Sequence, residues 1–133
     1  MSLQVCIMTP ARVFWNDEAE ELILPTNTGQ MGVLSNHAPL ITALDIGAMM
    51  VRTKQEWRAV ALMGGFALVK NNQVTILVNE AEASSTIDPR EAEKAFEEAK
   101  VRLEQAQGEK EKVEATFTFK RARARYQIVQ TKA

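Results

Sequence analysis

The sequence predicts a mainly β protein that ends in two helices: an N-terminal antiparallel β-sandwich over residues 1–86 and a C-terminal antiparallel helical hairpin over residues 87–133. Up to about residue 85, short runs alternate apolar and polar side chains between turn-forming residues, as half-buried strands do. Beyond that point, apolar residues recur every three or four positions, as on one face of a helix. The chain has 133 residues, 46% hydrophobic and 25% charged, which is enough for a compact domain with a small appendage.

The first half is expected to form short strands at residues 3–8, 12–15, 20–24, 40–44, 48–52, 57–63, 66–70 and 73–78. Turn signals separate these runs at Thr9-Pro10, Ser35-Asn36, Asn71-Asn72 and residues 25–29 and 45–47. Many short strands with regular turns are typical of an antiparallel sandwich or a flattened barrel.

The second half begins with a strong helix start at residues 88–91, where Asp88 suits the N-cap, Pro89 the first helical position and Glu91 the capping box. One apolar stripe then follows, at Ala92, Phe96, Ala99, Leu103 and Ala106, and Gly108 is a plausible end. A second stripe has the same spacing, at Ala115, Phe119, Ala122, Tyr126 and Val129. Residues 116–119 also alternate like a strand, which leaves open whether the second helix is continuous. Because both stripes are rich in alanine, we expect the hairpin to be weakly stable by itself.

Composition excludes several classes of protein. The formal net charge of −1 argues against a nucleic-acid binder, which normally carries a basic excess. Cys6 is the lone cysteine, so no intramolecular disulfide can form and a reducing compartment is expected. The longest uncharged run, between Arg58 and Lys70, is too short to span a membrane, and no secretory signal is visible. We therefore expect a soluble protein.

Catalytic and metal-binding signals are sparse. Cys6 and the single histidine, His37, supply too few ligands for a structural zinc site, and no phosphate-binding glycine loop is present. An enzyme that uses His37 as a base would need a nearby nucleophile or carboxylate, and the sequence indicates none. The acidic group at Asp17, Glu18, Glu20 and Glu21 is interpreted as a charged strand edge. A binding or regulatory subunit is favoured over an enzyme.

The most informative feature is a basic cluster on the second helix, at Lys120, Arg121, Arg123 and Arg125. From residue 115 onward every charged side chain is positive. Two interpretations remain open on charge alone. The cations form either a solvated face that complements the helix dipole or a surface for an acidic partner.

Several segments together resemble the epsilon subunit of the F-type ATP synthase, in its chloroplast and cyanobacterial branch. They are LPTNTGQMGVLSNHAPL at residues 24–40, ALMGGFA at residues 61–67, VTILV at residues 74–78 and IDPREA at residues 87–92. The resemblance runs in order along nearly the whole chain. It implies the same sandwich and hairpin, in a non-catalytic subunit without a cofactor.

The resemblance also implies partners. In this family the sandwich belongs to the rotating central stalk of a proton-driven ATP synthase and contacts the gamma subunit and the c-ring. By motif position, Gln30, Met31 and Gly32 are expected to face the c-ring from an exposed loop, and His37 and Thr42 to lie toward gamma. The complex would place the chain peripherally on a thylakoid or plasma membrane, on the stromal or cytoplasmic side.

The hairpin is implied to be a mobile inhibitor. Folded down, it packs on the sandwich; extended, its basic helix reaches the alpha and beta catalytic subunits, contacts an acidic segment there and opposes ATP hydrolysis. Lys120, Arg121, Arg123 and Arg125 match that role. The small apolar content of both stripes suits an element with two packings of similar free energy.

One departure concerns nucleotides. Some bacterial members bind ATP through an Ile-Asp-x-x-Arg-Ala motif, and here Ile87 and Asp88 match it while Glu91 occupies the arginine position. Since an anion there would repel a phosphate, the sequence predicts no tight ATP binding. A module that senses ATP through the hairpin remains the alternative function.

Overall fold

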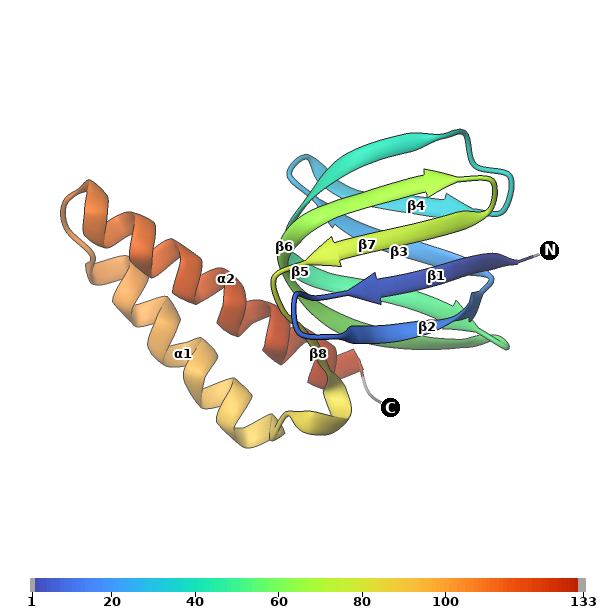
Figure 1. The fold of residues 1–133 in the computed structure, drawn as a ribbon. Coiled ribbons are helices and arrows are strands. Elements are labelled where there is room, and N and C mark those ends of the chain that lie inside the picture. Colours follow the sequence, from blue (N-terminus) through green and yellow to red (C-terminus); the bar gives the residue numbers. More distant parts are fainter. Residues whose placement is uncertain (1, 132–133) are drawn as a thin grey trace.

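The computed structural model describes residues 2–131 and shows a curved sheet with two helices at one end (Figure 1). The sheet runs in the order β2-β1-β7-β6-β5-β3-β4, and a short strand, β8, also pairs with β6. The strands are β1 Leu3–Met8, β2 Val13–Ala19, β3 Glu21–Thr26, β4 Gly29–Leu34, β5 Leu40–Thr53, β6 Glu56–Lys70, β7 Gln73–Val78 and β8 Ala81–Ala83. All pairings are antiparallel except that of β1 with β7, which is parallel.

The longest strands, β5 and β6, carry the sheet from one layer of the sandwich to the other. The sequence predicted a turn at residues 45–47 and a break between residues 63 and 66, but both strands continue through these segments. Their pairing leaves out Asp45 and Gly64, between Leu44 opposite Gly65 and Ile46 opposite Met63. Turn-forming residues therefore mark a bend inside paired strands, where the register is unchanged and one residue of each strand is left out of the pairing.

Gly65 is required at this bend. Its φ of 158° lies in a region that other residues rarely adopt, and a Cβ there would collide with the backbone carbonyl oxygen of Leu77. The close approach of β6 and β7 at this point depends on the missing side chain.

The segment at residues 29–34, which was expected to be an exposed loop, is strand β4. It pairs with β3, and Gln30, Met31 and Gly32 lie opposite Pro25, Leu24 and Ile23. The sequence of β4 does not show the alternation of apolar and polar residues that is typical of a strand, because it contains two glycines and a glutamine. Only Val33 of this strand is fully buried. β4 ends the strand order and leaves one of its edges without a strand partner.

Two apolar clusters stabilise the molecule. The larger fills the sandwich, and its biggest fully buried side chains are Leu3, Ile7, Leu22, Leu24, Met49, Leu62 and Ile76. The smaller lies between β6 and the helices, and it is composed of Ala59, Ala61, Met63, Ile87, Ala92, Ala124, Ile128 and Val129. Because half of the buried residues in the second cluster are alanines, it buries less apolar area than the first.

The helical hairpin consists of α1 Pro89–Gln105 and α2 Glu109–Thr131. Gly108, with φ of 79°, lies in the turn between them. The Phe96 ring of α1 stacks between Phe119 and Tyr126, with centroids 5.5 and 5.2 Å away. α2 packs against β5 and β6, α1 packs against α2, and the far end of the hairpin projects away from the sandwich (Figure 1).

α2 is continuous through residues 116–119, which settles the ambiguity in the sequence. The Thr116 and Thr118 hydroxyls donate to the carbonyl oxygens of Lys112 and Glu114, at 2.7 and 3.0 Å. Such bonds let threonine sit inside a helix by using the preceding turn as its acceptor. Over residues 2–131, neither helix is long and apolar enough to cross a membrane.

Candidate functional site

The basic residues of α2 face carboxylates of the chain's own sandwich. Lys120 Nζ lies 3.2 Å from Oδ2 and 3.3 Å from Oδ1 of Asp45, on β5. Asp45 Oδ1 also accepts a hydrogen bond from the backbone N–H of Ile46, at 2.8 Å. The β5–β6 pairing leaves out Asp45 and Gly64, and the bend at this point presents the Asp45 carboxylate to the helix.

Two arginines continue the same contact along the segment around β8. Arg121 Nη2 lies 3.1 Å from Glu80 Oε1, and its Nη1 lies 3.4 Å from Glu80 Oε2. Arg125 Nε donates to Glu82 Oε1 at 3.0 Å. Since Glu82 lies opposite Ala61 on β6, the sheet holds this carboxylate under α2.

These ion pairs are only partly shielded from water. The side chains of Arg125 and Glu82 are 22% and 19% exposed, whereas those of Arg121 and Glu80 are 42% and 50% exposed. Exposed pairs typically contribute about 0.2–1 kcal/mol each. The sequence left undecided whether the basic cluster faces solvent or an acidic surface. The chain itself supplies acidic partners for Lys120, Arg121 and Arg125, and it binds them weakly.

Arg123 behaves differently from its neighbours. Its guanidinium carbon lies 5.3 Å from the centroid of the Phe119 ring, in a cation–π contact. The side chain lines a cleft of about 500 Å³ between α2 and strands β3 to β5. Gln30, one of the predicted c-ring contacts, lines the other side of this cleft.

The predicted c-ring contacts are brought together on β4. Gln30 and Gly32 are exposed and Met31 is half-buried. A Cβ added at Gly32 would meet nothing within 4 Å. An edge strand, rather than a loop, therefore carries the predicted contacts, with Gln30 and Gly32 on its exposed face and Met31 packed against the core of the sandwich.

The predicted gamma contacts lie close in sequence but do not form a joint site. His37 lies in the connection between β4 and β5, and its Nδ1 is 2.7 Å from the carbonyl oxygen of Ala38. Thr42 is half-buried on β5, and its hydroxyl donates to the carbonyl oxygen of Ala43 at 3.3 Å. Within residues 2–131, no nucleophile or carboxylate is hydrogen-bonded to His37, so the structure offers no catalytic unit around it.

An exposed apolar patch on the sheet was missed by the sequence analysis. It consists of Ile41, Phe66, Leu68 and Leu77, which are 72%, 59%, 44% and 50% exposed. Ile41 lies opposite Leu68, and Phe66 lies opposite Leu77, so the patch crosses β5, β6 and β7. The sequence does contain a signal for this patch, because apolar residues occupy both faces of these three strands. Contiguous exposed apolar surface commonly marks an interaction site.

The residues that match the nucleotide motif have structural roles. Ile87 is buried in the cluster beneath α2, at 5% exposure. Asp88 Oδ1 accepts from the backbone N–H of Arg90 at 3.0 Å and so caps α1. The reciprocal capping-box bond from Glu91 is not formed among the described residues, and Glu91 is exposed.

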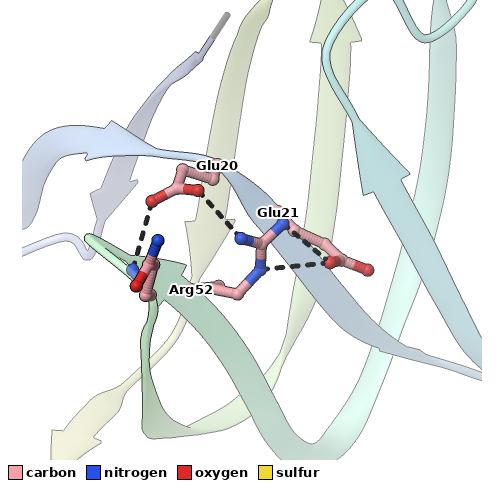
Figure 2. A network of polar contacts seen from close by, with 4 residues as sticks. Glu20, Glu21 and Arg52 are labelled. Carbon is pink, nitrogen blue, oxygen red and sulfur yellow. Dashed lines mark hydrogen bonds and ion pairs between the residues drawn. The ribbon is translucent and has the colours of Figure 1, made fainter.

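The acidic residues near β2 and β3 also contribute to the fold. Figure 2 shows the guanidinium of Arg52 between Glu20 and Glu21, at 2.8 and 3.2 Å. The second carboxylate oxygen of Glu20 accepts from the backbone N–H of Gln55 at 3.2 Å. Glu20 and Glu21 therefore fix the β5–β6 turn to the start of β3. No cluster of metal-ligating side chains is found among residues 2–131.

Comparison with known proteins identifies both parts of the chain. The family model "ATP synthase, Delta/Epsilon chain, beta-sandwich domain" matches residues 2–84. The model "ATP synthase, Delta/Epsilon chain, long alpha-helix domain" matches residues 85–130. Two solved structures share the fold. They are a mitochondrial ATP synthase assembly from Euglena gracilis (TM-score 0.80, 23% identity, 91% of this chain and 77% of that chain) and a central stalk and c-ring from Tetrahymena thermophila (TM-score 0.65, 17% identity, 97% of each chain).

Curated relatives are much closer in sequence. The chloroplastic ATP synthase epsilon chain of Chlorella vulgaris is 74% identical over 97% of this chain and 96% of its own length. That of Tupiella akineta is also 74% identical, over 97% and 99%, and that of Chlamydomonas reinhardtii is 62% identical, over 97% and 96%. The chain therefore belongs to the ATP synthase delta/epsilon family as an epsilon chain, a non-catalytic subunit of that complex.

Proposed function

We propose that this subunit restrains ATP hydrolysis with α2, which contacts an acidic segment of the alpha and beta subunits when the hairpin leaves the sandwich. The observation that carries this proposal is the pairing of Lys120, Arg121 and Arg125 with carboxylates of the sandwich. The docked hairpin satisfies the same charges that an acidic partner would bind. The cations therefore become available to the partner only when the hairpin undocks.

The docked state is suited to reversible release. Half of the buried residues in its apolar cluster are alanines, and its ion pairs remain partly exposed to water. A two-state element of this kind can be shifted by a ligand or partner whose affinity for the two states differs by a few kcal/mol. The end of the hairpin that carries the α1–α2 turn projects away from the sandwich (Figure 1).

The sandwich is proposed to join gamma to the c-ring. The apolar patch of Ile41, Phe66, Leu68 and Leu77 lies on the outer face of the sheet, opposite to the face of Thr42, and supports a gamma contact on that outer face. Gln30, Met31 and Gly32, on the free edge strand β4, support a c-ring contact elsewhere on the sandwich. Separate surfaces would let one rigid domain bind both partners in the proton-driven rotor.

The location follows from the complex. The relatives with 74% identity are chloroplastic. We infer that this chain lies on the stromal side of the thylakoid membrane, held there peripherally by gamma and the c-ring. The alternative of ATP sensing gains no support, since Ile87 is packed and Asp88 caps α1.

The decisive experiment compares the full chain with a truncation that ends at residue 87, before Asp88. We expect the truncated subunit still to assemble with gamma and the c-ring, and ATP hydrolysis by the soluble catalytic assembly to rise. Unchanged hydrolysis in a fully assembled complex would refute the inhibitory role of the hairpin. Loss of assembly would instead refute the assignment of partner binding to the sandwich.

A further inference from the structure

Arg123 is the cation of the basic cluster that pairs with no carboxylate of residues 2–131. Among residues 2–131, the other members of the cluster, Lys120, Arg121 and Arg125, each have an acidic partner within 3.2 Å. Arg123 lies against Phe119 and borders the cleft between α2 and the sandwich. The ring contact holds the guanidinium in place without neutralising its charge.

The cleft beside Arg123 has walls from both parts of the molecule. α2 contributes Arg123, Gln127 and Gln130, and the sandwich contributes Gly29 and Gln30 from β4 and Asp45 from β5. The volume of about 500 Å³ lies within the usual range for small-molecule sites. The cleft is therefore large enough for a small ligand and exists in this form only while α2 is docked.

The cleft has one positive charge that no neighbouring carboxylate among residues 2–131 neutralises. Asp45 is the one carboxylate among its described lining residues, and both of its oxygens lie within 3.3 Å of Lys120 Nζ. That pair is nearly neutral as a unit. Arg123 remains as a positive charge that faces an open, water-accessible space.

We propose that this cleft binds inorganic phosphate. The fork of N–H groups in a guanidinium matches two oxygens of a phosphate, and the remaining oxygens can accept from amides. The side-chain amides of Gln30 and Gln130, from opposite walls, supply such donors. A carboxylate has only two oxygens, which Arg123 alone would occupy. The site is distinct from the nucleotide motif, because neither Ile87 nor Asp88 lines this cleft.

Phosphate would then act as a regulator of the hairpin. A ligand that contacts both α2 and β4 binds the docked state and not the undocked one, so it stabilises docking by mass action. The consequence for inhibition rests on the function proposed above, whereas the site itself does not.

The test is isothermal titration calorimetry of the full chain with inorganic phosphate, at an ionic strength held constant with sodium chloride. The variants are Arg123→Gln on the helix wall and Gln30→Ala on the sandwich wall. Arg12→Gln is the matched control, because Arg12 also lies over a phenylalanine ring, Phe14 at 5.4 Å, but does not line the cleft. Circular dichroism establishes that each variant is folded.

We expect saturable binding by the wild type and by Arg12→Gln, and affinity lower by roughly tenfold or more in Arg123→Gln, as loss of a charge-assisted hydrogen bond predicts. Gln30→Ala should also weaken binding; unchanged affinity would overturn the two-walled site.

Succinate, titrated as a carboxylate control, should bind more weakly than phosphate, and equal affinity would overturn the phosphate assignment. Absence of binding, or equal binding by Arg123→Gln, would overturn the site altogether. No catalytic subunit is present in this experiment, so its outcome is independent of the hydrolysis test.

Discussion

The ammonium group of Lys120 lies 3.2 Å from Asp45 Oδ2, and this contact joins α2 to the bend of β5. Asp45 is 75 residues away in sequence and is presented by the irregular pairing of β5 with β6. Two residues further along β5, Gly47 lies so close to Pro25 that an added Cβ would be 2.8 Å from the proline Cβ. Pro25 in turn pairs with Gln30. Asp45, which holds α2, and the predicted c-ring contacts on β4 are thus linked through β3 within one bent sheet.

Replacing Asp45 with asparagine should weaken docking of the hairpin. The variant removes a partly buried charge pair, with side chains 34% and 30% exposed, for which about 0.2–1 kcal/mol is expected. Hydrogen exchange at the amides of α2 should become faster, and inhibition of ATP hydrolysis in the complex should increase. The control is Glu18→Gln, because Glu18 is an exposed residue of β2 without an ion pair among the described residues. Equal exchange rates in Asp45→Asn and the wild type would contradict the assigned role.

Salt should shift the equilibrium between the docked and undocked hairpin. Raising sodium chloride from about 0.01 M to about 1 M shortens the Debye length from about 30 Å to about 3 Å, which weakens exposed ion pairs. We expect the docked fraction to fall, as measured by energy transfer between labels on the sandwich and on α2. The combined variant Asp45→Asn, Glu80→Gln, Glu82→Gln should respond much less to salt, because its pairs are already absent. A response equal to that of the wild type would show that the pairs do not set the equilibrium.

The apolar part of docking depends on Ile128, which is fully buried between α2 and β6. Ile128→Ala removes this side chain and leaves a cavity, at a cost of about 2–5 kcal/mol for a well-packed site. We expect faster exchange along α2 while the amides of β1 and β7 stay protected. Val113→Ala, on the same helix but 68% exposed, should leave exchange unchanged. Equal protection in both variants would mean that Ile128 does not hold the helix.

The sequence alone predicts the two halves and the helix boundaries because these depend on local signals. Asp88 caps α1 as expected, and Gly108 lies in the turn between the helices. It could not predict that the strands on either side of Asp45 are one strand, because a turn-forming residue looks the same in a turn and in a bend. Strand β4 was missed for a related reason, since Gln30 and Gly32 carry no apolar signal.

The candidate site illustrates a second limit. The basic cluster was visible in the sequence, but its partners Asp45, Glu80 and Glu82 were unremarkable polar residues there. They become an acidic surface only because β5 and the segment around β8 meet under α2. The apolar patch at Ile41 and Phe66 also requires the strand register, which places separate exposed residues side by side.

Two glycines provide a matched test of the fold. Gly65→Ala should destabilise the sandwich by about 3 kcal/mol or more, because the new Cβ collides with backbone and the φ of 158° is strained for alanine. Gly32→Ala has open space around its Cβ and should change the free energy of unfolding by less than about 0.5 kcal/mol. Urea denaturation of both variants checks this difference. Similar midpoints would show that β7 can move away from residue 65.

The apolar patch can be tested separately from folding. Ile41 is 72% exposed, so Ile41→Lys removes no core contact and should leave the denaturation midpoint unchanged. If gamma covers this face, the substitution buries a charge in the interface and should reduce affinity for gamma by roughly tenfold or more. Val113→Lys is the control, since Val113 is 68% exposed on α2, outside the sheet that carries the patch. Titration of immobilised gamma with each variant gives the comparison. Full affinity in Ile41→Lys would exclude this face as the contact, whereas equal loss in both variants would show that the added charge, and not its place on the patch, lowers the affinity.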